Sequence, residues 1–231
     1  MNPIISLNEW ESQFFKRKIG TVVFDRSAVM DAIFSAQDYD LITAKVSTDT
    51  IDQIDWLQQN EFELVEGSVE FSLDLANYRG DLTACYRAEP QDLASLSPLF
   101  STAFPHSRFR PPYFLEEENQ RFYHQWIRNS LSGEFDDLCL VERDEKQNII
   151  GGVSLRIREQ TAQIGLLAVN AHCRGKGIGK KLMQQSISWA IAQQATQLKI
   201  VTQLSNLAGI QLYQSFQAKI TQTHYWFYRQ C

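Results

Sequence analysis

The fold of this chain is decided by IGLLAVNAHCRGKGIGKKLMQQSISWA, residues 164–190. An apolar run ends at Val169, and three glycines then alternate among four cations in residues 174–181. Apolar residues recur at helical spacing immediately afterwards, from Ile178 to Ile191. The pattern predicts a strand, a glycine loop and a helix in direct succession.

Two well-known phosphate-binding loops do not fit these glycines. The P-loop pattern would need glycine where Arg174 stands and a hydroxyl residue where Lys181 stands. The dinucleotide pattern GxGxxG, started at Gly175, would need glycine where Lys180 stands. What remains is a helix start with free amides and the positive end of the helix dipole, which suits a pyrophosphate. A plain glycine-rich turn with solvated cations is the alternative.

Strands and helices alternate outward from this stretch. Strands are predicted at residues 136–142, 148–157, 161–169, 197–203 and 220–229, and another around TACYRAE, residues 83–89. Helices are predicted at residues 89–104, 113–131, after the glycine loop, and at 206–216. This order predicts an α/β (α+β) fold with a mixed central sheet in residues 82–231. A smaller α/β domain is predicted in residues 1–75, with the boundary at ANYRGDL, residues 76–82.

The first 75 residues contain a faint echo of the C-terminus. IDWLQQNEFELVEGSVEFSL and GIQLYQSFQAKITQTHYWFY share a helix, a short turn and a strand, and Leu57 stands where Tyr213 stands. A degenerate repeat predicts a front domain that is a truncated copy of the C-terminal domain. Two unrelated helix–strand units are the alternative.

Composition excludes several classes of protein. The net charge of −5 over 231 residues argues against nucleic-acid binding. No apolar run is long enough to span a bilayer, and the N-terminus lacks a signal-peptide pattern, so we expect a cytoplasmic protein. The four cysteines and four histidines are scattered without metal-ligand spacing, so no metal site is predicted.

The glycine loop, with the strand before it and the helix after it, resembles the acyl-CoA site of the GNAT superfamily of N-acetyltransferases. The superfamily pattern [QR]-x-x-G-x-[GA] is matched by residues 174–179. The resemblance implies the GNAT fold, acetyl-CoA as co-substrate, and a split in the sheet where backbone groups hold the thioester arm. The implied acetyl-CoA contacts are Leu167, Ala168, Val169, Arg174, Gly175, Lys176, Gly177, Ile178, Gly179, Lys180 and Asn206.

Tyr213 is the predicted catalytic residue. The family places a tyrosine on the helix after the fifth core strand, close to the thioester sulfur, where a phenol can act as general acid for the departing thiolate. Asn206 begins the same predicted helix, and seven residues return Tyr213 to nearly the same face, about 10 Å along the axis. The alternatives are a core aromatic for Tyr213 and an ordinary N-cap for Asn206.

AFPHSRFRPPYF and RFYHQWIRNSLSGEFDDLCLV, with NEFELVEG, resemble the GNAT enzymes that acetylate dTDP-4-amino-4,6-dideoxygalactose in enterobacterial common antigen synthesis. The resemblance implies a dTDP-amino sugar as the acceptor. The predicted acceptor contacts are Arg108, Arg110, Tyr113 and Tyr123. A cationic and aromatic segment suits a nucleoside diphosphate.

Several questions stay open at this level. Glu159 and His106 are candidates for a general base, but each also fits a surface or structural role, so the base stays open. Another amine acceptor, or a CoA-binding module without catalysis, is an alternative function. The aromatic segment HYWFYR, residues 224–229, is a candidate for pairing with a second chain in a homodimer.

Overall fold

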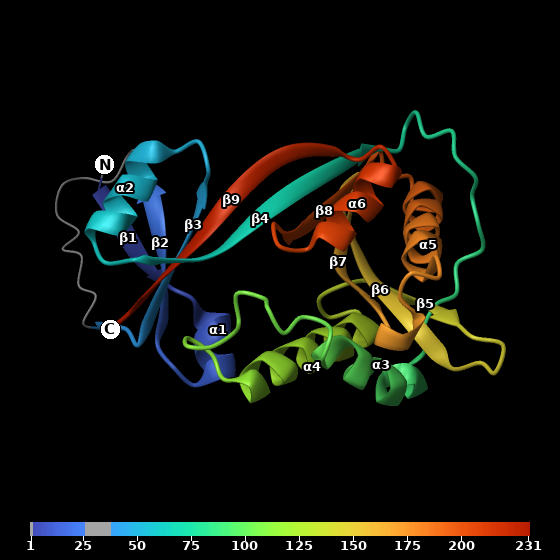
Figure 1. Ribbon diagram of the computed structural model, residues 1–231, viewed down its shortest axis with the longest axis horizontal. Helices are drawn as coiled ribbons and strands as arrows, with labels where there is room; N and C mark the ends of the chain where they lie inside the picture. The colour runs from blue at the N-terminus through green and yellow to red at the C-terminus, as the bar shows by residue number, and fades with distance from the viewer. Residues whose placement is uncertain (1, 26–37) are drawn as a thin grey trace.

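A computed structural model describes residues 2–25 and 38–231. Its strands form one nine-stranded mixed sheet in the order β1-β2-β3-β9-β4-β8-β7-β6-β5 (Figure 1). In the first third of the chain the elements are β1 (Asn2–Leu7), α1 (Glu9–Phe15), β2 (Ile19–Asp25), β3 (Leu41–Ser47), α2 (Ile51–Gln59) and β4 (Glu63–Asp74).

The rest of the chain begins with the short turn η2 (Pro90–Asp92) and two helices, α3 (Leu93–Ser101) and α4 (Glu116–Ser132). It continues with β5 (Leu138–Arg143), β6 (Ile149–Arg158), β7 (Thr161–Val169), η3 (Ala171–Cys173), α5 (Ile178–Ala192), β8 (Gln197–Gln203), α6 (Leu207–Ser215) and β9 (Lys219–Gln230). The predicted mixed sheet with flanking helices is confirmed.

The strand predicted around TACYRAE is wrong. This segment forms only an isolated bridge between Arg87 and Leu140. Two backbone hydrogen bonds, Ala88 N–H to the Cys139 carbonyl and Val141 N–H to the Tyr86 carbonyl, hold it against β5. Farther back it bonds to side chains of α5 instead of a strand, so a full ladder does not develop.

Strand β4 precedes the predicted boundary in the sequence but lies between β8 and β9 in the sheet. It pairs antiparallel with both strands, while β9 pairs with β3 on its other edge. Residues 224–228 of β9 are therefore paired on both sides, and Arg229 is paired with β3 alone. Residues 224–228 thus have no free edge for pairing with a strand of a second chain, and a homodimer formed in another way stays a prediction.

The pairing of β4 with β9 has an internal two-fold symmetry. Adding 156 to a residue number carries Glu63 onto Lys219 and Ser72 onto Tyr228, and the pairs Glu63–Tyr228 and Ser72–Lys219 are both present. The same shift carries the bulge at Val65 of β4 onto the bulge at Thr221 of β9. A shared register defect at equivalent places is the kind of detail that a repeat preserves.

The symmetry extends beyond these two strands. The shift of 156 carries β3 onto β8, and it carries the β3–β9 ladder onto the β8–β4 ladder, so that Leu41–Gln230 becomes Gln197–Asp74. Leu57 falls on Tyr213, and Leu57 is completely buried. The geometry supports a degenerate repeat whose front copy keeps the packing and lacks the phenol.

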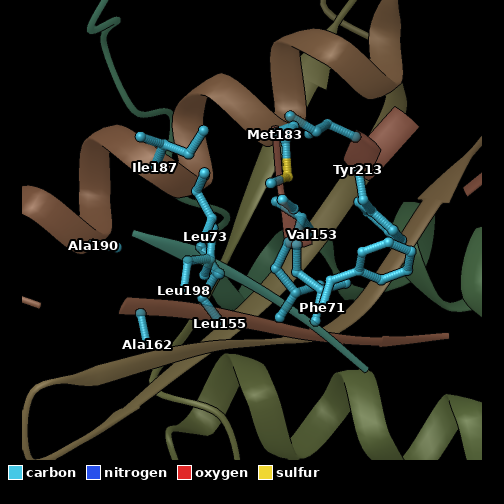
Figure 2. Packing of buried hydrophobic residues seen from close by; sticks show 14 of the residues in the cluster. Phe71, Leu73, Val153, Leu155, Ala162, Met183, Ile187, Ala190, Leu198 and Tyr213 are labelled. Carbon is cyan, nitrogen blue, oxygen red and sulfur yellow. The ribbon is translucent and has the colours of Figure 1, made fainter. Parts of the chain in front are cut away.

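Helices cover both faces of the sheet. Residues of α5 and α6 pack on one face of β4, β7 and β8, and α2 packs on the same face near β3 and β9 (Figure 1). Helices α1, α3 and α4 pack on the opposite face. Figure 2 shows Met183 and Ile187 of α5 above Leu73 of β4 and Leu198 of β8. Burying each side chain of this size contributes about 1.5–3 kcal/mol, so α5 is firmly fixed behind the glycine loop.

Local signals explain the ends of α4. Glu116, Glu117 and Glu118 occupy its first turn, where acidic groups favour the helix dipole. Gly133 ends it with a φ of 76°, a left-handed conformation that glycine adopts without strain. Its buried face, with Phe122 and Ile127, supports the loop that leads to the site described next.

Candidate active site

The parallel strands β7 and β8 separate part-way along their length. They pair only from Thr161–Gln197 to Ile164–Ile200, although β7 continues to Val169. On its other edge β7 stays paired with β6 to the end, where Val169 lies opposite Gly151. The edge of β7 that faces β8 therefore has no strand partner after Ile164 among the residues that the structure describes. This is the split that the resemblance implied.

A bulge at Gly165 explains the separation. The β6–β7 register slips by one residue there, and the Leu166 amide donates to the Ser154 hydroxyl at 3.0 Å. A Cβ atom on Gly165 would lie 2.5 Å from a carboxylate oxygen of Asp136, so only glycine fits. Asp136 is fully buried and is fixed by Arg156 at 2.9 Å. The bulge bends β7 away from its neighbour, and sequence reasoning missed Gly165.

A cleft of about 790 Å³ opens at this separation. Its walls come from the loop after α3, the end of β7, the glycine loop, the first turn of α5, the end of β8 and the helix α6. The predicted residues that line it are Leu167, Ala168, Val169, Arg174, Gly175, Gly177, Ile178, Gly179, Lys180, Asn206 and Tyr213. Lys176 is the predicted acetyl-CoA contact that does not line it.

The glycine loop leaves backbone donors free at the start of α5. Gly175 and Gly177 have φ values of 74° and 80°, which other residues rarely adopt. Gly177 is the N-cap of α5 and no side chain caps this helix. The first-turn amides of a helix have no acceptor within it, so they are free to bind an anion. Arg174 is held across the loop by a hydrogen bond from Nε to the Val169 carbonyl at 3.3 Å.

Asn206 caps helix α6. Its side-chain Oδ1 accepts from the Gly209 amide at 3.0 Å, and its Nδ2 donates to the Thr202 hydroxyl at 2.8 Å. The alternative interpretation of Asn206 as the N-cap of this helix is therefore confirmed. Asn206 also lines the cleft, and the cap fixes the start of the helix that carries Tyr213.

Tyr213 lies in the wall of the cleft and at the edge of the core at once. It is 5% exposed and packs on Phe71 with ring centroids 5.7 Å apart (Figure 2). Burial raises the pKa of Tyr213 to about 12, so the phenol stays protonated at neutral pH. Tyr213 also lines the cleft. A protonated phenol in the wall of a cleft can donate a hydrogen bond to a group bound there.

The predicted acceptor residues lie elsewhere. None of the four lines the cleft. Arg108 forms an ion pair with Glu11 at 2.5 Å and donates to the Tyr228 hydroxyl at 2.6 Å. Its guanidinium stacks over Phe109 and Trp226.

The other three predicted acceptor residues also have protein partners. Arg110 donates to the Val65 carbonyl at 2.8 Å. Tyr113 donates to a carboxylate oxygen of Glu63. Tyr123 is 6% exposed and packs on Phe104. These contacts connect the 103–114 segment to the front strands, and a direct contact with the nucleotide stays a prediction.

The two base candidates differ in position. His106 lines the cleft, together with Phe104 and Pro105. Glu159 lies in the exposed turn between β6 and β7, with a φ of 55°, and does not line it. Cys173 also lines the cleft, beside the glycine loop. Gln203, at the end of β8, also lines the cleft, and the sequence analysis did not predict it. The only feature of the sequence that points to Gln203 is its position three residues before Asn206.

The sequence profile of the acetyltransferase (GNAT) family matches residues 93–217, which contain the split strands, the glycine loop and Tyr213. The chain belongs to the GNAT acetyltransferase family. It is 36% identical over 221 residues to the dTDP-fucosamine acetyltransferase of Escherichia coli O6:H1, covering 95% of each chain. It is 24% identical to the spore coat polysaccharide biosynthesis protein SpsD of Bacillus subtilis, covering 95% of this chain and 80% of that protein.

A solved structure has the same fold at low sequence identity. The GCN5-related N-acetyltransferase from Sphaerobacter thermophilus superposes with a TM-score of 0.62 at 14% identity. The match covers 82% of this chain and 59% of that one. This likeness shows the fold, and the family match shows that the chain is an enzyme of a family that uses acetyl-CoA.

Two negative findings apply to the described part of the chain. Residues 2–25 and 38–231 hold no group of three or more metal-ligating side chains. No helix in these ranges is long and apolar enough to cross a membrane.

Proposed function

We propose that this acetyltransferase moves the acetyl group of acetyl-CoA to the 4-amine of a dTDP-4-amino-4,6-dideoxy sugar, dTDP-fucosamine, in enterobacterial common antigen synthesis. The observation that carries the acceptor is the 36% identity to the dTDP-fucosamine acetyltransferase over 95% of both chains. A match of that extent includes the front segment as well as the GNAT core. The chemistry is supported by the cleft, in which the glycine loop, the split strand and Tyr213 meet.

The co-substrate would lie along the split. The free amides at the start of α5 face the position suited to its diphosphate, and Arg174 and Lys180 add positive charge there. The unpaired edge of β7 at residues 167–169 offers backbone groups to the amide-containing arm. Asn206 stands at the opposite wall, at the head of α6. When bound, the thioester supplies the activated acyl group.

Tyr213 is proposed to donate to the sulfur as it leaves. A free thiol has a pKa near ~8.5, below the value of about 12 that burial gives Tyr213. Full proton transfer to a solvated thiolate would therefore be unfavourable. In the cleft the thiolate is itself desolvated, which raises its own pKa. The phenol then stabilises the developing charge with a hydrogen bond and delivers its proton as the C–S bond breaks.

The acceptor side of the cleft is proposed to be the 103–106 loop and the end of β8. Phe104, His106 and Gln203 line this end of the cleft. Arg108 and Arg110 follow in the same segment, where they tie it to α1 and β4. Their proposed contribution is to fix the shape of the acceptor loop.

Thiol release from acetyl-CoA, measured across a panel of amines, tests the function. The panel should contain dTDP-4-amino-4,6-dideoxygalactose, its free sugar, an aminoglycoside, spermidine and a peptide N-terminus. We expect the dTDP-linked sugar to give a kcat/KM at least tenfold above every other amine. A higher value for a polyamine or a peptide would refute the proposed acceptor, and no thiol release with any amine would refute the enzyme assignment.

A further inference from the structure

The middle of the sheet carries a polar row on the face that holds α1, α3 and α4. The row consists of one residue from each of the neighbouring strands β3, β9, β4 and β8, namely Ser47, His224, Ser68 and Gln203. The helices on this face mainly contact strands nearer the edges of the sheet: α1 contacts β2, α3 contacts β6 and β7, and α4 contacts β5 and β6. In Figure 1 β4 and β9 continue past α3 and α4 as a curved span. The polar row crosses this span.

One end of the polar row lies in the cleft. Gln203 lines the cleft together with His106 and Tyr213. The amide of Gln203 is held in place, because its Nε2 donates to Glu66 Oε2 at 3.0 Å and to the His106 carbonyl at 3.3 Å. The row therefore begins at the wall of the cleft where the acceptor amine is proposed to lie.

The two middle residues of the row have polar atoms without partners. Ser68 is 4% exposed, and its Oγ is buried with no hydrogen-bond partner among the described residues. His224 Nδ1 is also buried and has no partner in the same part of the chain. Burial and the charge of Lys45 lower the pKa of His224, so its imidazole is neutral at pH 7. Buried polar atoms are costly when they are left unpaired, and a hydroxylated ring bound on the row would supply partners.

Lys45 of β3 lies at the far end of the row. It is opposite Trp226 in the β3–β9 ladder, and its Nζ is 5.8 Å from the centre of that ring. Lys45 is accessible to solvent, and the burial of part of its side chain lowers the pKa of its ammonium group, while Glu70 opposes the fall. Glu70 is itself paired with Lys199 at 3.3 Å, and Lys45 forms no ion pair in the described part of the chain. A partly desolvated cation without a carboxylate partner suits an anionic ligand.

The length of the row fits a sugar followed by a diphosphate. Neighbouring strands lie about 4.8 Å apart, so the three steps from β8 to β3 span about 14 Å. The Lys45 side chain shortens this gap, because it faces Glu70 and His224 on the strands between. A ligand whose amine lies in the cleft beside Gln203 and whose ring lies on Ser68 therefore has its next groups at the ammonium of Lys45.

We propose that Lys45 binds the diphosphate of the nucleotide-sugar acceptor, while the sugar lies on the polar row with its amine at the Gln203 end. The inference rests on the proposed dTDP-amino sugar and gives the front segment of the chain a direct part in binding it. An ammonium group forms strong, charge-assisted hydrogen bonds with phosphate oxygens. Arg108 and Arg110, the cations that the sequence suggested for this task, have protein partners instead.

Steady-state kinetics of Lys45→Met test the proposal, because Met keeps the apolar stem of the side chain and removes the charge. We expect the KM for dTDP-4-amino-4,6-dideoxygalactose to rise at least tenfold, with kcat and the KM for acetyl-CoA close to the wild-type values. The constant for competitive inhibition by dTDP, which carries the diphosphate without the sugar, should rise by a similar factor. Lys45→Arg should recover most of the loss. Lys18→Met is the matched control, because it also removes a front-segment ammonium group that lies over an aromatic ring, 5.0 Å from the centre of Tyr39.

An acceptor KM and a dTDP inhibition constant that both stay at the wild-type values in Lys45→Met would overturn the proposal. Equal rises in the KM values for the acceptor and for acetyl-CoA would overturn it as well, because they would indicate a general structural effect. If Lys45→Met does not fold, Lys45→Gln replaces it with the same expected results. The wild type in the same assay separates this inference from the proposed function. A wild type that does not prefer the dTDP-linked sugar to the free sugar would refute the proposed acceptor, whereas a wild-type preference that Lys45→Met retains would refute only the role of Lys45.

Discussion

Replacing Glu66 with Gln should stabilise the protein at pH 8. Burial raises the pKa of Glu66 from 4.5 to about 7, so the folded protein binds this proton more tightly than the unfolded chain does. The favourable contribution is present at pH values below 4.5 and is lost as pH rises through 7. A pKa change of one corresponds to about 1.36 kcal/mol, so the full rise would change the free energy of unfolding by at most roughly 3.4 kcal/mol. Because Glu66 is only half-buried, we expect Glu66→Gln to gain about 1–3 kcal/mol at pH 8.

The pH dependence is the decisive part of this prediction. The gain in the free energy of unfolding should be smaller at pH 6 than at pH 8 by about 1 kcal/mol. Both of these pH values lie above the isoelectric point of about 5.4. For a chain of this length the gain at pH 8 corresponds to a Tm higher by roughly 2–10 °C. Thermal unfolding of wild type, Glu66→Gln and the control Glu70→Gln at both pH values gives the measurement. A Glu66→Gln variant that is less stable at pH 8, or equally shifted at both pH values, would refute the reasoning.

Three further predictions concern the cleft and the acceptor loop. Tyr213→Phe should lower turnover at least tenfold and leave acetyl-CoA affinity unchanged, and equal turnover would remove the phenol from the mechanism; Tyr225→Phe is the matched control. Gly177→Val should weaken acetyl-CoA binding at least tenfold in calorimetry, because a β-branched residue does not adopt a φ of 80° without strain, and unchanged affinity would contradict the role of the loop. Arg108→Ala should lower the free energy of unfolding by about 3–5 kcal/mol, because it leaves the Glu11 carboxylate buried and unpaired. Adding Glu11→Gln to this variant should recover part of the lost stability. An Arg108→Ala variant as stable as the wild type would contradict the structural role of the ion pair.

The core of the fold could be predicted because its signals are local. The alternation up to Val169, the glycines and the apolar spacing of α5 all lie within 27 residues of sequence and are set by the periods of strands and helices. The spacing from Asn206 to Tyr213 also placed both residues in one cleft. These features depend on neighbours along the chain, which a single sequence displays.

The rest depends on contacts between distant segments. The split after Ile164 follows from Gly165 lying against Asp136, which is 29 positions earlier. The ion pair of Arg108 with Glu11, from the first helix, joins residues 97 positions apart and has no local signal. The insertion of β4 between β8 and β9 is a long-range pairing that no local pattern encodes. Glu66 had no signal in the sequence, because its properties come from burial and from Gln203.

The central claim is that the amides at the start of α5 hold the diphosphate of acetyl-CoA and direct its thioester along the split strand toward Tyr213. A crystal structure of the complex with acetyl-CoA tests it most directly. We expect diphosphate oxygens within hydrogen-bond distance of the amides of residues 177–180 and the thioester sulfur within hydrogen-bond distance of the Tyr213 hydroxyl. A diphosphate bound away from the glycine loop, or a sulfur out of reach of that hydroxyl, would contradict the account.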